Sequence, residues 1–316
     1  MYKVLILGCG NIGALYDFDN DEILTHAKAF NQYKVDLYLF DIDENLVRKV
    51  ANKYKAKVVP VIDNINFGDF DIISICTPTF THKKYLEKAL LNNVKVIICE
   101  KPISTDSDEI DHLINAYEKS NSKVIVNYFR RFQPAYLSLR NSIEEILKQE
   151  ELTNISIRTQ RGFINNSSHA FDLIQYLFNK PLELKNILVH NREKDHFDTD
   201  PTLSLQALWD EVNLSLQGLS NVYFSFFEID VFFTHQRISI QNAGKDIFYY
   251  QSEDSFQFLK PLFKVESLNK TDCIKDYMQH VIEYSISLIN ESSNLEDNFL
   301  EAVKLNKSML TILNNR

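Results

Sequence analysis

The stretch Met1-Tyr-Lys-Val-Leu-Ile-Leu-Gly-Cys-Gly-Asn-Ile-Gly13 decides the fold of this chain. Its β-type run, Lys3 to Leu7, has the length and composition of a buried parallel strand. The run breaks at Gly8-x-Gly10-x-x-Gly13, after which the chain can continue as a helix. A strand, three glycines at this spacing and a helix are typical of a nucleotide-binding turn.

Each glycine has a physical role in such a turn. Gly8 allows the tight turn out of the strand, Gly10 lets the backbone approach a pyrophosphate, and Gly13 lets the helix pack against the strand. The N–H groups at the start of the helix then face the phosphates. The chain has only 7 glycines, and three of them stand in this turn, which favours nucleotide binding over a simple strand–turn–helix.

Length and composition limit the remaining possibilities. A chain of 316 residues exceeds one typical domain, so two domains are expected. With 34 basic and 43 acidic residues and no basic stripe, nucleic acid is not expected as a partner. The four cysteines lack metal-type spacing, so we expect reduced thiols and no metal site. No apolar run approaches membrane-spanning length and the first strand starts at once, so we expect no membrane partner, no signal peptide and a cytoplasmic location.

The second predicted strand, Asp36 to Phe40, ends in Asp41-Ile-Asp43. An acidic residue at this point usually binds the adenosine ribose hydroxyls, which favours NAD over NADP. We assign this role to Asp41, because Asp43 is better placed to cap the helix predicted over 44–55. The acidic residue follows the glycines later than usual, and an insertion over 17–25 explains the delay.

Two later strands end in polar motifs. The strand Ile72 to Cys76 leads into Thr77-Pro78 and then His82, and the strand Val94 to Cys99 leads into Glu100-Lys101-Pro102. The carboxyl ends of parallel strands share one edge of the sheet, where open α/β folds bind ligands. A Glu-Lys pair at this edge is in the right place for chemistry, although such a pair taken alone is more often a surface ion pair.

Together these motifs resemble the glucose–fructose oxidoreductase / inositol dehydrogenase / rhizopine catabolism (Gfo/Idh/MocA) family. The residues that carry the resemblance are Gly8-Cys-Gly-Asn-Ile-Gly13, Cys76-Thr-Pro-Thr79 with His82, Cys99-Glu-Lys-Pro102, Val126-Asn-Tyr-Phe-Arg-Arg-Phe-Gln-Pro134 and Gly162-Phe-Ile-Asn-Asn-Ser-Ser-His-Ala-Phe-Asp172. The resemblance implies an α/β chain with an N-terminal Rossmann domain, a doubly wound parallel sheet, over 1–124. It implies a C-terminal α+β domain with a mostly antiparallel open sheet over 125–316.

The second half supports this division by its own pattern. Residues 153–162 alternate as a strand, and Ser167 to Phe178 is an amphipathic helix. Further strand-like runs are predicted at 184–189, 203–209, 212–217, 222–227, 232–241 and 247–251, followed by helices near 272–289 and 295–313. The aromatic run 222–233 carries more apolar surface than one sheet face needs. Since the resemblance implies a subunit interface on the open face, we expect a homodimer or homotetramer.

The resemblance implies an NAD-dependent oxidoreductase that transfers a hydride between nicotinamide and a hydroxyl or keto carbon of a sugar or nucleotide-linked sugar. The residues it places at the cofactor are Gly8, Gly10, Asn11, Ile12, Gly13, Asp41, Thr77, Pro78, His82, Glu100 and Lys101. The reaction also needs a group that moves the hydroxyl proton. Lys101 is the first candidate, because a partly desolvated lysine can act as acid or base.

His169 is the second candidate, the alternative being a polar residue at a helix start. Asp172 shares its helix face and can orient the imidazole or bind a substrate hydroxyl. The usual family pattern has Asp four residues before this histidine, where Asn165 stands here, and glycine two before it, where Ser167 stands. Asn165 cannot exchange a proton, so Lys101 and His169 would share the work while Asn165 forms a hydrogen bond. The alternative function is a non-catalytic, dinucleotide-sensing binding protein of the same fold.

Overall fold

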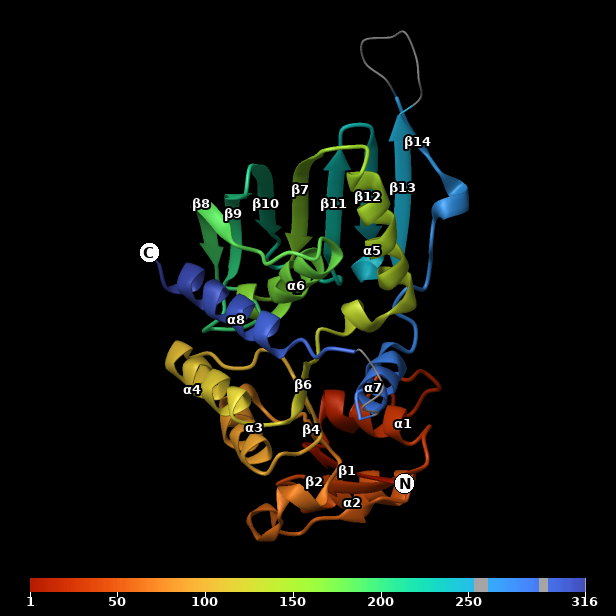
Figure 1. The fold of residues 1–316 in the computed structure, drawn as a ribbon, viewed down its shortest axis with the longest axis vertical. Coiled ribbons are helices and arrows are strands. Elements are labelled where there is room, and N and C mark those ends of the chain that lie inside the picture. The colour runs from red at the N-terminus through yellow and green to blue at the C-terminus, as the bar shows by residue number, and fades with distance from the viewer. Residues whose placement is uncertain (253–260, 290–294, 316) are drawn as a thin grey trace. The chain divides into compact units, whose positions relative to one another are not determined.

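The structure is a computed structural model that describes residues 1–252, 261–289 and 295–315 (Figure 1). The chain forms two compact units. The first comprises Met1–Phe132 and Asp276–Leu310, and the second comprises Gln133–Lys275 and Thr311–Arg316. These bounds differ from the predicted division after residue 124, because a segment near the end of the chain returns to the first unit.

The first unit is built on a six-stranded sheet in which all neighbouring strands are parallel. The strands are β1 (Tyr2–Leu7), β2 (Val35–Phe40), β3 (Lys57–Val58), β4 (Ile72–Ile75), β5 (Val96–Cys99) and β6 (Lys123–Val126). Their order, β3-β2-β1-β4-β5-β6, confirms the predicted doubly wound Rossmann sheet. The order reverses between β1 and β4, and ligands of this fold bind at that switch point.

Helices cover both faces of this sheet. One apolar cluster joins β1 to α1 (His26–Phe30), α2 (Glu44–Tyr54) and α7 (Tyr277–Ser287). The helices α3 (His82–Leu91) and α4 (Ser107–Glu118) pack against each other, and α3 contacts β4 and β5. We had expected the closing helices of the chain in the second domain. Instead, α7 lies in the first unit, because Met278, Val281 and Ile282 are buried in the same cluster as Val4 and Ile6.

The segment before α8 (Phe299–Asn314) closes the outer edge of the parallel sheet. The side-chain amide of Asn298 donates to the carbonyl of Val126 at 2.9 Å, and its oxygen accepts the Val126 N–H at 2.8 Å. The carboxylate of Asp297 accepts the Val124 N–H at 3.1 Å. Backbone groups of the edge strand β6 are thereby satisfied by side chains from the far end of the sequence.

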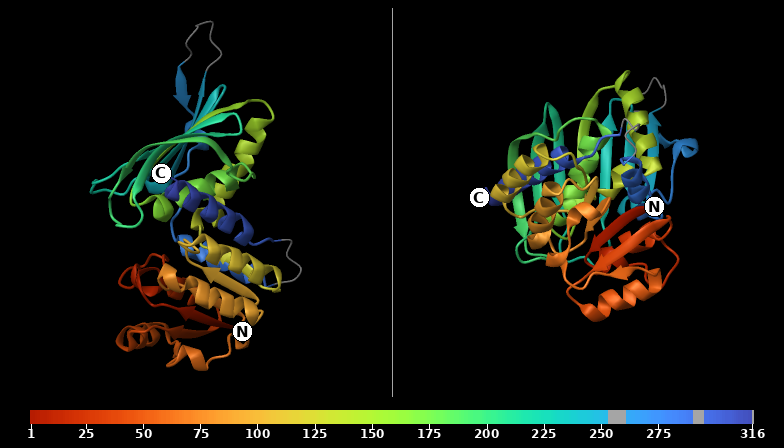
Figure 2. Two further views of the ribbon diagram at one scale, coloured as in Figure 1. Left: turned by 90° about the vertical axis from the view of Figure 1, so that its left-hand side faces the viewer. Right: turned by 60° about the horizontal axis from the view of Figure 1, so that its bottom comes forward.

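The second unit contains an eight-stranded sheet in the order β14-β13-β12-β11-β7-β10-β9-β8. The strands are β7 (Leu152–Thr159), β8 (Leu184–Glu193), β9 (Thr202–Trp209), β10 (Val212–Gly218), β11 (Phe227–Phe233), β12 (Gln236–Gln241), β13 (Asp246–Ser252) and β14 (Leu262–Lys264). Among the described strands of this second sheet, only β7 and β10 pair in parallel, which confirms the mostly antiparallel prediction. The helices α5 (Pro134–Leu147) and α6 (Ser168–Leu177) lie on one face (Figure 2).

The prediction for the aromatic run 222–233 was wrong in detail. Residues 221–226 form no strand, and β11 begins only at Phe227. Val231 and Phe233 point into the core, where both are buried. The opposite face of the sheet carries an ion-pair network, in which Asp230 accepts from Arg158 and Arg237 at 2.7 Å each. Period-two alternation therefore places most of the apolar surface of β11 inside the unit, while Glu228, Asp230 and the half-buried Phe232 lie on the open face.

Candidate functional site

The three glycines of the first turn are required for different physical reasons. Gly8 has a φ of +94°, and a Cβ there would lie 2.8 Å from the carbonyl oxygen of Cys76. A Cβ on Gly13 would lie 2.1 Å from the carbonyl oxygen of Gly8. A Cβ on Gly10 would meet nothing within 4 Å. Packing within the chain thus explains Gly8 and Gly13, whereas the space beside Gly10 is left open by the protein.

The segment after the turn contains the predicted insertion over 17–25. Asn11–Leu15 forms a π-helical turn of five residues, and the chain then runs through the predicted insertion to α1. The buried carboxylate of Asp17 organises this insertion. One of its oxygens accepts the N–H groups of Leu24 and Thr25 at 2.6 and 2.8 Å, and the other accepts the Thr25 hydroxyl at 2.7 Å. Asp17 therefore ends the helical turn by holding the loop that follows it.

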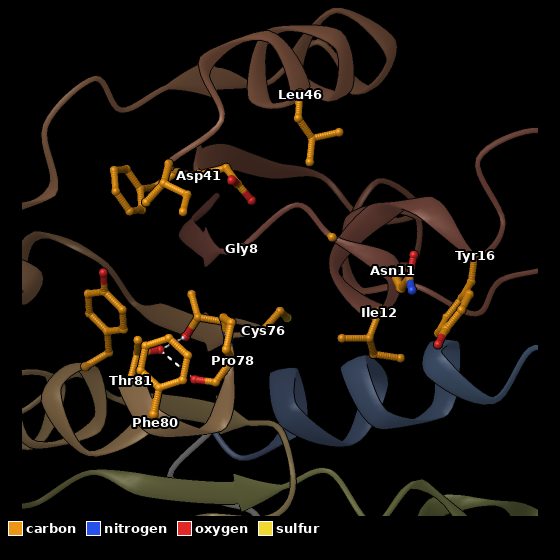
Figure 3. A pocket seen from close by; sticks show the side chains of 15 residues that line it. Gly8, Asn11, Ile12, Tyr16, Asp41, Leu46, Cys76, Pro78, Phe80 and Thr81 are labelled. Carbon is orange, nitrogen blue, oxygen red and sulfur yellow. Dashed lines mark hydrogen bonds between the residues drawn. The ribbon is translucent and has the colours of Figure 1, made fainter. Parts of the chain in front are cut away.

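A cavity of about 680 Å³ opens at the carboxyl ends of β1, β2 and β4 (Figure 3). Its lining residues are Gly8, Gly10, Asn11, Ile12, Tyr16, Phe40, Asp41, Ile42, Leu46, Cys76, Thr77, Pro78, Phe80, Thr81 and Tyr85. Seven of the predicted cofactor residues are among them: Gly8, Gly10, Asn11, Ile12, Asp41, Thr77 and Pro78. Four others in the described part of the chain, Gly13, His82, Glu100 and Lys101, lie outside this lining. The volume is that of a small-molecule site.

The two acidic residues after β2 have separate roles. Asp43 caps α2, since its carboxylate accepts the N–H groups of Asn45 and Leu46 at 2.9 and 3.0 Å, as predicted. Asp41 turns to the glycine turn, where its carboxylate accepts the Cys9 N–H at 2.7 Å. The Asp41 carboxylate therefore lines the cavity in a fixed position, and each of its oxygens has a further lone pair for a ligand hydroxyl.

The rim of the cavity is unusually apolar. Ile42 is 91% exposed and Phe80 is 82% exposed, and both line the cavity together with Leu46. Large apolar side chains at such exposure favour contact with a flat apolar ligand. Sequence reasoning missed Ile42 and Phe80, although Ile42 directly follows Asp41 and Phe80 directly follows the Cys76-Thr-Pro-Thr79 motif.

His82 connects two strand ends instead of facing the cavity. It is buried at the start of α3, with Nδ1 2.8 Å from the carbonyl oxygen of Pro102 and Nε2 2.8 Å from that of Thr77. Burial lowers the pKa of His82, although the carbonyl groups around it oppose this effect. His82 thus ties the loop after β4 to the loop after β5.

Glu100 lies in a buried chain of polar side chains. Its Oε1 accepts from the Asn127 amide at 2.6 Å and lies 3.0 Å from Nε2 of His26. Burial would raise the pKa of Glu100, but the bonds from His26 and Asn127 and the charge of Lys101 lower it. Sequence reasoning assigned no role to His26 or Asn127, although Asn127 stands in one of the motifs that carry the resemblance.

The predicted catalytic residues of the second unit lie in and before α6. His169 and Asp172 are both buried in this helix. Asn165 lies in the preceding turn, and its amide donates to the carbonyl of Arg161 at 3.1 Å. Sequence reasoning missed Asp200, whose carboxylate accepts the Asn165 N–H at 2.7 Å and holds this turn in place.

Within residues 1–252, 261–289 and 295–315, no group of three His, Cys, Asp or Glu side chains has a geometry that could hold a metal ion. Over the same ranges, no helix is both long enough and apolar enough to cross a membrane.

Comparisons with known proteins agree with this geometry. Residues 2–128 match the model of GFO_IDH_MocA, described as an oxidoreductase family with an NAD-binding Rossmann fold. Inositol 2-dehydrogenase from Rhizobium meliloti (strain 1021) is 27% identical over 189 residues, which cover 54% of this chain and 53% of that protein. The chain therefore spans about half the length of the curated relatives it matches.

Solved structures resemble nearly the whole chain. UDP-N-acetylglucosamine 3-dehydrogenase from Acidithiobacillus ferrooxidans superposes with a TM-score of 0.76 at 17% identity, covering 98% of this chain and 96% of that one. A super-repressor mutant of Gal80p from Saccharomyces cerevisiae gives a TM-score of 0.75 at 14% identity, covering 98% and 95%. At these identities the likeness shows a shared fold.

Proposed function

Because the chain belongs over residues 2–128 to the Gfo/Idh/MocA oxidoreductase family, we propose that it is an NAD-dependent oxidoreductase acting on a hydroxyl or keto carbon. The observation that carries this proposal is the cavity at the switch point of the sheet. There the open space beside Gly10 and the Asp41 carboxylate lie in one lining. Each suits a different part of a dinucleotide.

The lining fits NAD part by part. The pyrophosphate would approach the backbone at Gly10, where no protein atom competes for the space. The adenosine ribose hydroxyls would donate to the Asp41 carboxylate, and the adenine ring would cover exposed apolar surface of Ile42 and Phe80. A 2′-phosphate would bring like charge to Asp41, at a cost of about 1–3 kcal/mol. NADP is therefore the weaker ligand.

A fluorescence titration tests the cofactor assignment. The affinity for NADH should be at least about tenfold higher than the affinity for NADPH. Asp41→Ala should weaken the binding of NADH and reduce the difference in affinity between the two cofactors. Asp43→Ala is the matched control, because it removes a neighbouring carboxylate that caps α2 instead of facing the cavity. Equal affinity of the unaltered protein for the two cofactors would remove Asp41 from this role.

Proton transfer is assigned to residues of the chain. When bound, the nicotinamide would supply the hydride acceptor or donor. Lys101, at the carboxyl end of β5, and His169, in α6, would move the substrate proton and polarise its oxygen, with Asp172 and Asn165 as hydrogen-bonding groups. Lys101→Ala and His169→Ala should each slow turnover by about 10²–10⁴-fold. If the two residues act together, the rate loss of the double variant should be much smaller than the product of the two single-variant rate losses.

The substrate class follows from named relatives and remains part of the proposal. Inositol 2-dehydrogenase and UDP-N-acetylglucosamine 3-dehydrogenase are both named for polyhydroxylated ring substrates. We propose a sugar, cyclitol or nucleotide-linked sugar here. The test is a panel of such compounds with NAD or NADH, read by cofactor absorbance, with Lys101→Arg as a variant that keeps the charge but exchanges protons poorly.

The second candidate is a dinucleotide-sensing protein without turnover. The observation that favours it is Asn165, which replaces an expected carboxylate and whose amide holds its own turn through Arg161. The fold shared with a Gal80p mutant described as a super-repressor is compatible with this reading. NADH binding without turnover of any panel compound, together with no effect of Lys101→Ala, would favour the sensor.

We also propose a homodimer or homotetramer in the cytoplasm. The open face of the eight-stranded sheet, with its network around Asp230, is the candidate interface, which would then be polar. Four free cysteines agree with a reducing compartment. Light scattering at micromolar concentration tests the assembly, and a monomer would show that the open face is a solvated surface.

A further inference from the structure

A continuous chain of polar side chains runs from the interior of the first unit to the wall of the cavity. Glu100 contacts His26 as described above, and Nδ1 of His26 lies 2.7 Å from the hydroxyl of Ser74. That hydroxyl lies 3.5 Å from the sulfur of Cys76. Cys76 lines the cavity, where Figure 3 shows it beside Gly8 and Pro78. The proposed mechanism of hydride transfer makes no use of His26, Ser74 or Cys76.

The order Ser74, His26, Glu100 has the donor pattern of a catalytic triad, but Ser74 cannot be a nucleophile. Its side chain is fully buried in β4, so no substrate carbonyl can reach the hydroxyl. The half-buried Cys76 stands one hydrogen bond nearer the cavity. Any nucleophilic role of this chain therefore belongs to the sulfur.

The chain can hold its protons in two arrangements. In one, the Cys76 thiol donates to Ser74, whose hydroxyl donates to a neutral His26. In the other, the protons have moved along the chain, so that His26 is an imidazolium and Ser74 donates to a thiolate. Glu100 accepts from His26 in both. Burial would lower the pKa of His26, but Cys76 and Glu100 outweigh it and raise the pKa to about 10.

We propose that Cys76 is a modifiable thiol on the wall of the cofactor cavity, that the chain through Ser74 to His26 takes up its proton when the sulfur reacts, and that its oxidation by a small hydroperoxide obstructs cofactor binding. The effect on the cofactor rests on the proposed function, since it assumes that the cofactor binds there. The reactivity of the thiol does not depend on that assumption.

The oxidation balances with hydrogen peroxide as the oxidant. The thiolate sulfur attacks one peroxide oxygen, so an S–O bond forms as the O–O bond breaks. The sulfur loses two electrons and becomes a sulfenic acid, while the peroxide is reduced. The leaving hydroxide takes the proton that His26 had accepted from the thiol and departs as water. The added oxygen would extend from a wall of the cavity that Gly8 and Pro78 also line.

The other cysteines provide an internal comparison. Cys9, Cys99 and Cys273 are buried, whereas Cys76 is half-buried. Burial raises the pKa of Cys9 to about 12 and that of Cys273 to about 11. The reactive form of a cysteine is the thiolate, so these two thiols should react slowly at neutral pH.

The first test measures alkylation with limiting iodoacetamide and peptide mass spectrometry. Cys76 should be labelled about tenfold or more faster than Cys273, and Ser74→Ala should slow the labelling of Cys76 about tenfold. Ser285→Ala is the matched control, because it removes another fully buried hydroxyl, bonded to Val281, outside the chain. Equal labelling of Cys76 and Cys273 would overturn the proposal without any variant, even if Ser74→Ala failed to fold. A folded Ser74→Ala that reacts as fast as the unaltered protein would also overturn it.

The second test links the thiol to the cavity. Saturating NADH should protect Cys76 from iodoacetamide, and hydrogen peroxide should produce a dimedone-trapped sulfenic acid at Cys76 with about a tenfold loss of NADH affinity. Treatment of Cys76→Ala with peroxide should leave its NADH affinity equal to that of the untreated variant. The proposal fails if NADH binds and oxidation of Cys76 leaves its affinity unchanged. Failure of the proposed function would instead appear as no NADH binding by the untreated protein.

Discussion

Alanine at Gly10 and at Gly13 should separate cofactor binding from folding. Gly10 has an extended backbone, with φ of −69° and ψ of −158°, which alanine tolerates, and its Cβ would meet no atom within 4 Å. Gly10→Ala should therefore leave the free energy of unfolding unchanged or raise it by up to about 1 kcal/mol. Its methyl group would stand where the pyrophosphate approaches, so the affinity for NADH should fall at least about tenfold.

Gly13→Ala should have the opposite profile. Its Cβ would lie 2.1 Å from the carbonyl oxygen of Gly8, whereas ordinary contact begins at 3.4 Å, so the backbone must move by about 1.3 Å. Overpacking of this kind costs about 1–3 kcal/mol. NADH affinity should fall as well, because the displaced carbonyl belongs to the same turn.

Urea unfolding and NADH fluorescence titration, run on the same preparations, measure the two effects. Gly68→Ala is the control, because its Cβ would make only ordinary contacts of 3.5 Å or more and Gly68 is not among the residues that line the cavity. If Gly10→Ala binds NADH as tightly as the unaltered protein, no phosphate approaches Gly10. If Gly10→Ala loses more stability than Gly13→Ala, the packing argument is wrong.

Three further predictions concern stability. Asp43→Ala removes two hydrogen bonds to the first turn of α2 and should lower the free energy of urea unfolding by about 1 kcal/mol. An unchanged free energy of unfolding would show that this cap does not stabilise the helix. The pKa of Glu100 lies below its usual 4.5, so its carboxylate stabilises the fold above that value and this contribution is lost as the pH falls through the folded pKa. Glu100→Gln should flatten the acid side of the melting-temperature profile, and an unchanged profile would contradict the assignment. Asp230→Ala leaves Arg158 and Arg237 without the acceptor that they share, so the free energy of unfolding should fall by about 1–3 kcal/mol. A change no larger than that of a substitution at an exposed site would contradict this prediction.

The local structure around the glycine turn followed from the sequence because its determinants are local. A short apolar run bounded by glycines specifies a buried strand and a tight turn wherever it occurs in a chain. The cap at Asp43 depends on N–H groups two and three residues away. The insertion over 17–25 was predicted from its acidic composition, but composition does not reveal that Asp17 holds it by accepting the N–H groups of Leu24 and Thr25.

The second unit shows how a small error in a strand boundary changes the surface. Alternation predicted correctly that strands follow one another after residue 184, but the register in which β11 pairs with β7 and β12 decides which of its side chains face inward. Because side chains alternate with a period of two, moving the register by one residue exchanges the two faces. Val231 and Phe233 therefore lie in the core, and the ion pairs of Asp230 lie on the open face.

The sequence by itself determined the Rossmann fold, the acidic residue at the end of β2 and the strand ends that carry Thr77 and Lys101. Only the tertiary structure decided that His82 ties two loops together and that His26, Ser74 and Glu100 form one chain behind Cys76. Strand identity is set by the pattern of neighbouring residues. Contacts between side chains 48 and 74 residues apart depend on the order in which strands pair and on the face each side chain takes, and those are properties of the assembled sheet.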